Sequence, residues 1–180
     1  MELNNRIKSS KERGTSLIEL MIACLVLMVG VMGVVSLIPI AIAENGRNRQ
    51  QSNSTVISQM VMEKILSVPA GTSTILSISD CTPTAFSINT TGSAGAGTGA
   101  TLQATGDVNF SVAAPGGYSM LYTACGAGGA QSVYDVRWNI QAPSAYVKLI
   151  TISTRLKGSG NNATLFSLPV TIRSMSGQGS

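Results

Sequence analysis

The stretch LIELMIACLVLMVGVMGVVSLIPIAIA, residues 17–43, decides the architecture of this chain. From Leu20 to Ala43 it contains 24 consecutive residues without a charge. About 20 apolar residues in a helix suffice to cross the hydrocarbon core of a bilayer, so this stretch is long enough to span one. Four basic residues precede it, and the first charge after it is Glu44. This bias predicts residues 1–14 in the cytoplasm and the C-terminal bulk across the membrane.

A small residue, Gly14, lies on the cytoplasmic side of the apolar run, directly after Lys11-Glu12-Arg13. An ordinary secretory signal has a shorter apolar core and a cleavage site on its far side. A cut after Gly14 would instead remove a basic leader and leave the apolar helix on the mature protein. The mature chain would then begin with a new amine at Thr15.

Glu19 is the one charge near the start of the apolar run. A carboxylate is costly inside a membrane and less so near the interface. One interpretation is an acid in the first helical turn, stabilised by the positive end of the helix dipole. The other is a buried carboxylate that pairs with a cation from a neighbouring subunit. The amine freed at Thr15 of an adjacent chain would be its natural partner.

Residues 11–21, KERGTSLIELM, resemble the processing and methylation motif of type IV prepilins and type II secretion pseudopilins. In that family a basic leader ends in Gly, the first mature residue is N-methylated, and Glu occupies the fifth mature position. Gly14, Thr15 and Glu19 match these positions, although Phe is the usual first residue where this chain has Thr15. The resemblance is specific over residues 11–43 and looser to about residue 66.

The resemblance implies an α+β pilin fold, in which a long N-terminal helix is packed on a small antiparallel sheet. Its parts would be a cleaved leader (1–14), a transmembrane and filament-core helix (15–43), a soluble half-helix (44–68) and a β-sheet head (69–180). The implied partners are other pilin subunits, a prepilin peptidase that also methylates, and an inner-membrane assembly platform. The subunit would be stored in the bacterial inner membrane and then enter a pilus at the cell surface.

The segment after the apolar run continues as an amphipathic helix. Apolar residues recur at helical spacing and predict one buried stripe, made of Val56, Ile57, Met60, Val61, Ile65 and Leu66. Ser67-Val68-Pro69-Ala70-Gly71 should end the helix. Within the apolar run, Pro39 lacks a backbone N–H and should kink the helix or melt it locally.

The soluble part predicts short strands. Alternating or β-rich patterns cover residues 118–124, 133–140, 146–155 and 165–173, with turns at 142–144 and 158–162. An antiparallel meander packed on the second half of the helix satisfies these patterns. Residues 87–106 are rich in Gly and small residues and predict a flexible loop, and residues 174–180 predict a frayed tail.

Three cysteines occur. Cys24 lies in the apolar run and is interpreted as a small packing or lipid-facing residue. Cys81 and Cys125 are either two buried thiols or, in an oxidising compartment, a disulfide. A bridge between them would close a loop of 45 residues and contribute about 4 kcal/mol in the chain-entropy model.

Composition argues against several classes of function. The chain has no His, and Asp80, Asp107 and Asp135 stand alone in sequence as expected turn or surface residues, so neither an enzyme nor a metal or cofactor site is predicted. The net charge of +4 is divided between the leader and scattered residues, which argues against DNA binding. The arrangement is most similar to PilV-like minor pilins. A secretion pseudopilin and a non-pilin anchored binding domain are the alternatives.

Overall fold

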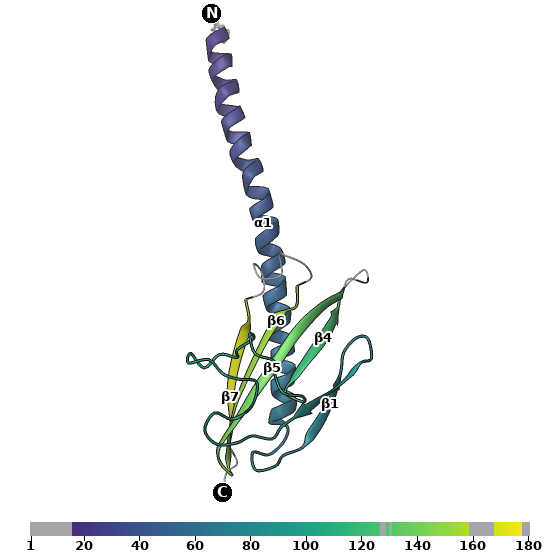
Figure 1. Cartoon of the computed structure of the whole chain (residues 1–180). Helices are drawn as coiled ribbons and strands as arrows, with labels where there is room; N and C mark the ends of the chain where they lie inside the picture. The colour runs from purple at the N-terminus through teal and green to yellow at the C-terminus, as the bar shows by residue number, and fades with distance from the viewer. Residues whose placement is uncertain (1–15, 127–128, 130, 159–167, 178–180) are drawn as a thin grey trace, which may run out of the picture. The chain divides into compact units, whose positions relative to one another are not determined.

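The computed structural model describes residues 16–126, 129, 131–158 and 168–177 (Figure 1). Contacts divide the chain into two compact units, Met1–Asn45 and Gly46–Ser180. The described part of the first unit is helical from Leu17 onward, and the second unit combines helix with antiparallel β-sheet. The predicted α+β class is therefore confirmed.

Helix α1 spans Leu17–Leu66. It ends as expected: the Ser67 N–H still donates to the Glu63 carbonyl, 2.9 Å away, and Pro69 follows two residues later. The helix is continuous through Pro39. The prediction that the helix melts locally at Pro39 is therefore wrong, because one missing N–H does not interrupt a helix that continues on both sides of the proline. A bend at Pro39 stays a prediction.

The larger sheet is the predicted meander. Its successive strands are all antiparallel: β4 (Ser119–Cys125), β5 (Gln131–Ser144), β6 (Val147–Leu156) and β7 (Val170–Gly177). A two-residue strand, β3 (Thr98–Gly99), pairs with β5 beyond the part of β5 that pairs with β4. Residues 165–167 of the last predicted strand lie outside the described residues.

Two predicted ends in this sheet are wrong. Pro143 was expected in a turn but belongs to β5, and the turn is formed by Ala145 and Tyr146. The pairing of β5 with β6 shifts register between Gln141 and Ser144, an irregularity of the kind at which a strand tolerates a proline. The predicted tail is also part of a strand, since β7 pairs with β6 as far as Gly177. Residues 178–180 lie outside the described residues.

A separate two-stranded sheet precedes the meander. Strands β1 (Ile75–Ser79) and β2 (Ala85–Asn89) form an antiparallel hairpin. The prediction of a loop over residues 87–106 is therefore wrong in part, because β2 extends to Asn89 and β3 lies within it. At Gly99 φ is +112°, and a Cβ there would lie 2.4 Å from the Trp138 carbonyl oxygen. Only a glycine permits this approach of β3 to β5.

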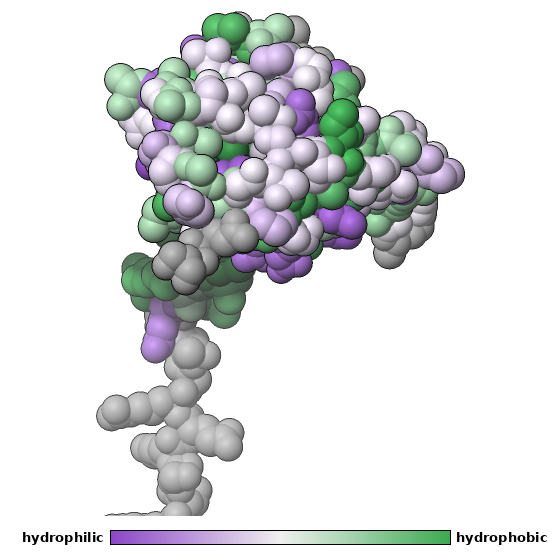
Figure 2. Space-filling view, turned by 90° about the horizontal axis from the view of Figure 1, so that it is seen from below, coloured by the Kyte–Doolittle hydropathy of each residue, from purple (hydrophilic) through white to green (hydrophobic). Residues whose placement is uncertain are grey.

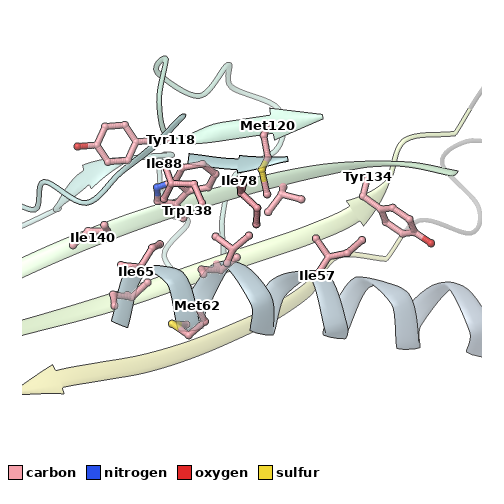
Figure 3. Packing of buried hydrophobic residues seen from close by; sticks show 14 residues of the cluster. Ile57, Met62, Ile65, Ile78, Ile88, Tyr118, Met120, Tyr134, Trp138 and Ile140 are labelled. Atoms are coloured by element: carbon pink, nitrogen blue, oxygen red, sulfur yellow. The ribbon is translucent and has the colours of Figure 1, made fainter. Parts of the chain in front are cut away.

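The core of the second unit lies between one face of α1 and the inner face of the sheet (Figure 3). Ile57, Val61, Met62 and Ile65 come from the helix, and Tyr134, Val136, Trp138, Ile140, Ile150 and Ile152 come from β5 and β6. The predicted stripe is correct at Ile57, Val61 and Ile65. It is wrong at Val56, which is 61% exposed, and it omitted Met62, which is 6% exposed. The sheet determines which face of α1 is buried, and this face is rotated by a fraction of a turn from the apolar stripe predicted from the sequence.

Candidate functional site: the apolar half of α1

The first unit exposes apolar side chains on every side of the helix. Each residue from Ser16 to Asn45 is exposed. Eighteen large hydrophobic side chains lie between Leu17 and Ile42, and their exposed fractions range from 52% to 76%. A helix that is apolar all round is normally buried in protein or in a membrane. By length and composition α1 is the one helix of the described residues that could cross a membrane.

Glu19 lies in the first turn of α1 and is exposed. From Ser16 to Asn45 there is no Lys or Arg, so the described part of this unit supplies no cation to neutralise the carboxylate. The dipole of the helix N-terminus favours an acid here, typically by about 0.3–1 kcal/mol. A full ion-pair partner would have to come from outside the described residues of the unit.

The structure describes only some of the other predicted positions of this region. Gly14 and Thr15, the predicted cleavage and methylation positions, lie outside the described residues. Cys24 is a free and exposed cysteine on the apolar surface. Ser36 is the one hydroxyl of the apolar run, and its Oγ donates to the Gly33 carbonyl 2.7 Å away. This local bond satisfies the hydroxyl without any partner chain.

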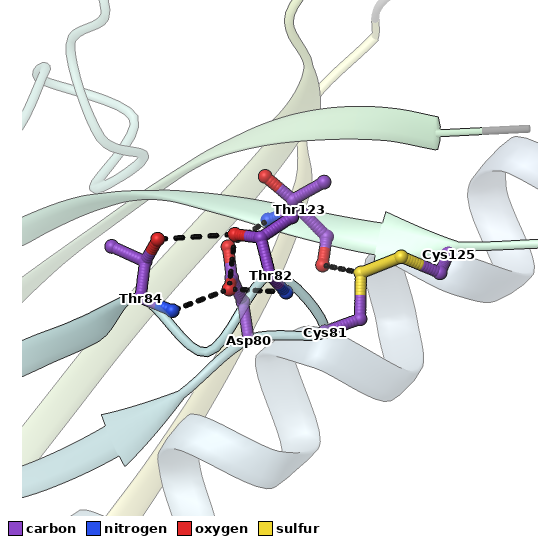
Figure 4. Close-up of a disulfide and its surroundings, with 6 residues drawn as sticks. All are labelled: Asp80, Cys81, Thr82, Thr84, Thr123 and Cys125. Carbon is purple, nitrogen blue, oxygen red and sulfur yellow. Dashed lines mark hydrogen bonds between the residues drawn. A yellow bond between two sulfur atoms is a disulfide. The ribbon is translucent and has the colours of Figure 1, made fainter.

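Cys81 and Cys125 form a disulfide, which is the alternative that the sequence predicted for an oxidising compartment (Figure 4). The bond joins the β1–β2 turn to the end of β4, across a sequence separation of 44 residues. The Cys81 sulfur also lies 3.1 Å from the Thr123 carbonyl oxygen. A disulfide sulfur has no proton to donate, so this is a contact between the turn and β4 and not a donated hydrogen bond.

Asp80 organises the same turn. Its Oδ1 accepts hydrogen bonds from the backbone N–H and hydroxyl of Thr82 and from the N–H of Thr84, and its Oδ2 accepts from the N–H of Thr123 on β4 (Figure 4). Desolvation by burial raises the pKa of this carboxyl, but the four hydrogen bonds outweigh it and bring the pKa to about 2. Asp80 is the expected turn residue, and it also attaches the hairpin to the meander.

Asp135 is not the expected surface residue, because it is 7% exposed. It lies on the face of the sheet opposite α1, where Arg137 binds both carboxylate oxygens at 2.9 and 3.0 Å and Arg155 binds Oδ2 at 3.2 Å. Phe110, from the segment that follows β3, covers this group. Sequence alternation correctly placed Asp135 on the face opposite the core. It was wrong that this face is wet at Asp135, because the segment after β3 covers it and no local pattern signalled that cover.

The described residues contain no group of three or more His, Cys, Asp or Glu side chains that could hold a metal ion. The visible surface of the second unit is mostly of neutral hydropathy, as Figure 2 shows by its pale colours.

A scan against family models, a search of curated proteins and a search of solved structures found no match to this chain.

Proposed function

We propose that this chain is a type IV pilin-like structural subunit, stored in the bacterial inner membrane and assembled into an extracellular filament through the apolar half of α1. The observation that carries the proposal is the uncovered apolar surface from Leu17 to Ile42. Lipid covers such a helix during storage, and the helices of neighbouring subunits cover it in a filament. Neither state requires a catalytic group, a metal or a cofactor.

Glu19 favours an assembling subunit over a plain anchor. In a simple anchor the helix dipole offsets only part of the cost of a carboxylate at the edge of the apolar segment, because the charge opposes insertion. In an assembling subunit this acid pairs with the amine of Thr15 from an adjacent chain, after a prepilin peptidase has cut the Gly14–Thr15 bond and methylated Thr15. Burying such a pair contributes little net stability, so the pair sets the register of neighbouring helices.

The finer assignment is a minor pilin of a type IV pilus. The long helix that continues from an apolar half into a half that backs an antiparallel sheet supports a pilin fold. The disulfide supports a destination beyond the cytoplasm, because disulfides persist in oxidising compartments. A type II secretion pseudopilin shares these features. The two differ in the assembly that they enter: a minor pilin enters a pilus visible at the cell surface, whereas a pseudopilin enters a short periplasmic assembly.

The first test is the N-terminus of the protein purified from membranes and from sheared filaments. Mass spectrometry should find chains that begin at Thr15, with an N-methyl group on its amine. Chains that retain Met1, or that begin beyond Ala43, would contradict the proposal and indicate an anchored binding domain or a removed signal. Replacing Gly14 with a bulky residue should block this processing.

The second test compares two acids at opposite ends of the apolar run. Glu19→Ala should leave cleavage intact but reduce the amount of subunit in sheared filaments to near the background level. Glu44→Ala removes the same charge at the other end of the run and should assemble normally. If the Glu19 variant enters filaments as well as the Glu44 variant does, Glu19 does not act in assembly.

A further inference from the structure

A cavity of about 420 Å³ lies on the face of the sheet away from α1, between the segment that follows β3 and the strands β6 and β7. Its volume falls in the range of small-molecule sites, which begins at about 300 Å³. The groups that line it are mostly polar: Gln103, Asp107, Ser111, Arg155 and Thr171, with Phe110 as the main apolar wall. It is separate from the apolar surface assigned to assembly.

The charges around the cavity do not cancel. Asp135 is shared by Arg137 and Arg155, so this group of three carries one excess positive charge. Asp107 is neutralised by Arg173 at 3.2 Å. The whole cluster of three arginines and two aspartates is therefore left with a charge of +1, and a single anionic group would balance it.

Arg155 is the arginine that faces the cavity. Arg137 is 13% exposed and uses all three of its nitrogens on Asp135 and the Val112 carbonyl. Arg155 is 35% exposed, and among the described residues only its Nη2 has a hydrogen-bond partner. Its remaining N–H groups are the planar fork that matches a carboxylate.

Phe110 fixes the orientation of this guanidinium. The central carbon of Arg155 lies 4.3 Å from the ring centroid, and that of Arg137 lies 4.9 Å from it. Such stacking holds a guanidinium by its face and leaves its edge available for hydrogen bonds. A cation held in place before the ligand arrives loses little conformational entropy on binding.

We propose that this cavity binds a small hydroxylated carboxylate, with a sugar acid of the hexuronate class as the best fit. The carboxylate pairs with those Arg155 N–H groups that have no partner among the described residues, and it balances the excess charge. The ligand hydroxyls donate to Asp107 and exchange hydrogen bonds with Gln103, Ser111 and Thr171. This combination of one cation with both donors and acceptors suits a polyhydroxylated monoanion better than an inorganic ion or a neutral sugar.

The test uses the full-length protein in detergent, titrated with sodium glucuronate and followed by ligand-observed NMR. Glucuronate should bind saturably, and glucose and sulfate should each bind at least about tenfold more weakly, because each lacks one half of the recognised chemistry. Failure of glucuronate to saturate would overturn the proposal. Equal binding of glucose or of sulfate would overturn the sugar-acid assignment.

Variants separate the site from general charge attraction. Arg155→Gln should weaken glucuronate binding about tenfold or more, whereas Lys157→Gln removes an exposed charge two residues away on the chain and should change it less than about twofold. Gln103→Ala leaves the ion cluster intact and should weaken binding about two- to tenfold. Equal losses for Arg155→Gln and Lys157→Gln, or no loss for either Arg155→Gln or Gln103→Ala, would refute the site.

Discussion

The two halves of α1 differ in what covers their apolar side chains. In the half that belongs to the second unit, most apolar residues lie on one face and contact the sheet, with Val61 fully buried and Val56 as the exposed exception. In the half that belongs to the first unit, apolar residues lie on all faces and the described structure covers none of them. One helix therefore combines a segment that is complete within its own chain with a segment that requires lipid or other subunits.

The largest expected effect comes from making the same substitution, Ile to Ala, in the core of the second unit and in the exposed half of α1. Ile152→Ala removes a side chain of zero exposure from the core and should lower the free energy of unfolding of the second unit by about 2–5 kcal/mol. Ile22→Ala changes a side chain that is 57% exposed in the first unit and should leave that free energy unchanged. Urea unfolding in detergent, followed by the fluorescence of Trp138, the only tryptophan, measures both. Similar losses in the two variants would refute this division of the helix.

The disulfide gives the second largest effect. Replacing Cys81 and Cys125 together with Ser should lower the free energy of unfolding of the second unit by about 2–4 kcal/mol, because the unfolded chain regains the freedom of a long loop. Cys24→Ser lies in the first unit and should not change the unfolding curve. Mass spectrometry of the alkylated wild-type protein should find one reactive thiol. Three reactive thiols in protein isolated without reductant would contradict the bridge.

A smaller effect compares two serines of α1. Ser58 is fully buried, and its hydroxyl bonds the Thr154 hydroxyl at 2.7 Å, whereas Ser36 bonds only its own helix. Ser58→Ala should cost about 1–3 kcal/mol of unfolding free energy, since it leaves a buried hydroxyl without its partner. Ser36→Ala should cost the second unit nothing. Adding Thr154→Val to the Ser58 variant should recover part of the loss in the same urea assay.

The smallest effect is confined to acid. The pKa of Asp80 is lowered from 3.8 to about 2 in the folded protein, so in this range the folded state binds fewer protons than the unfolded chain. The stabilisation from Asp80 is therefore complete above the unfolded pKa and is lost as pH falls through the folded pKa. The urea concentration at the unfolding midpoint of the wild type should fall as the pH is lowered from 3.8 to about 2. Asp80→Asn should remove that part of the fall, and Thr82→Ala should reduce it by deleting one donor to the carboxylate. An unchanged pH profile in Asp80→Asn would exclude this role.

Local patterns predicted the elements whose signals are strong. The apolar run and its flanks predicted α1 to within two residues of its observed end, because helix length follows from local composition and from the Ser67-Val68-Pro69 terminator. Alternation predicted β5 and β6, since their inner faces supply most of the core. The short β1–β2 hairpin and the two residues of β3 have weak propensities of their own. They form because other parts of the chain hold them, as the Trp138 indole N–H does by donating to the Asn89 carbonyl.

The sequence by itself determined that a long helix with a wholly apolar half precedes an antiparallel sheet, because charge, hydropathy and alternation are local properties of the chain. Only the tertiary structure decided which helical face is buried, that Cys81 lies against Cys125, and that Asp135 joins two arginines beneath Phe110. These features depend on residues far apart in the chain whose register is set by strand pairing and by the helix docked on the sheet. No local pattern specifies that register.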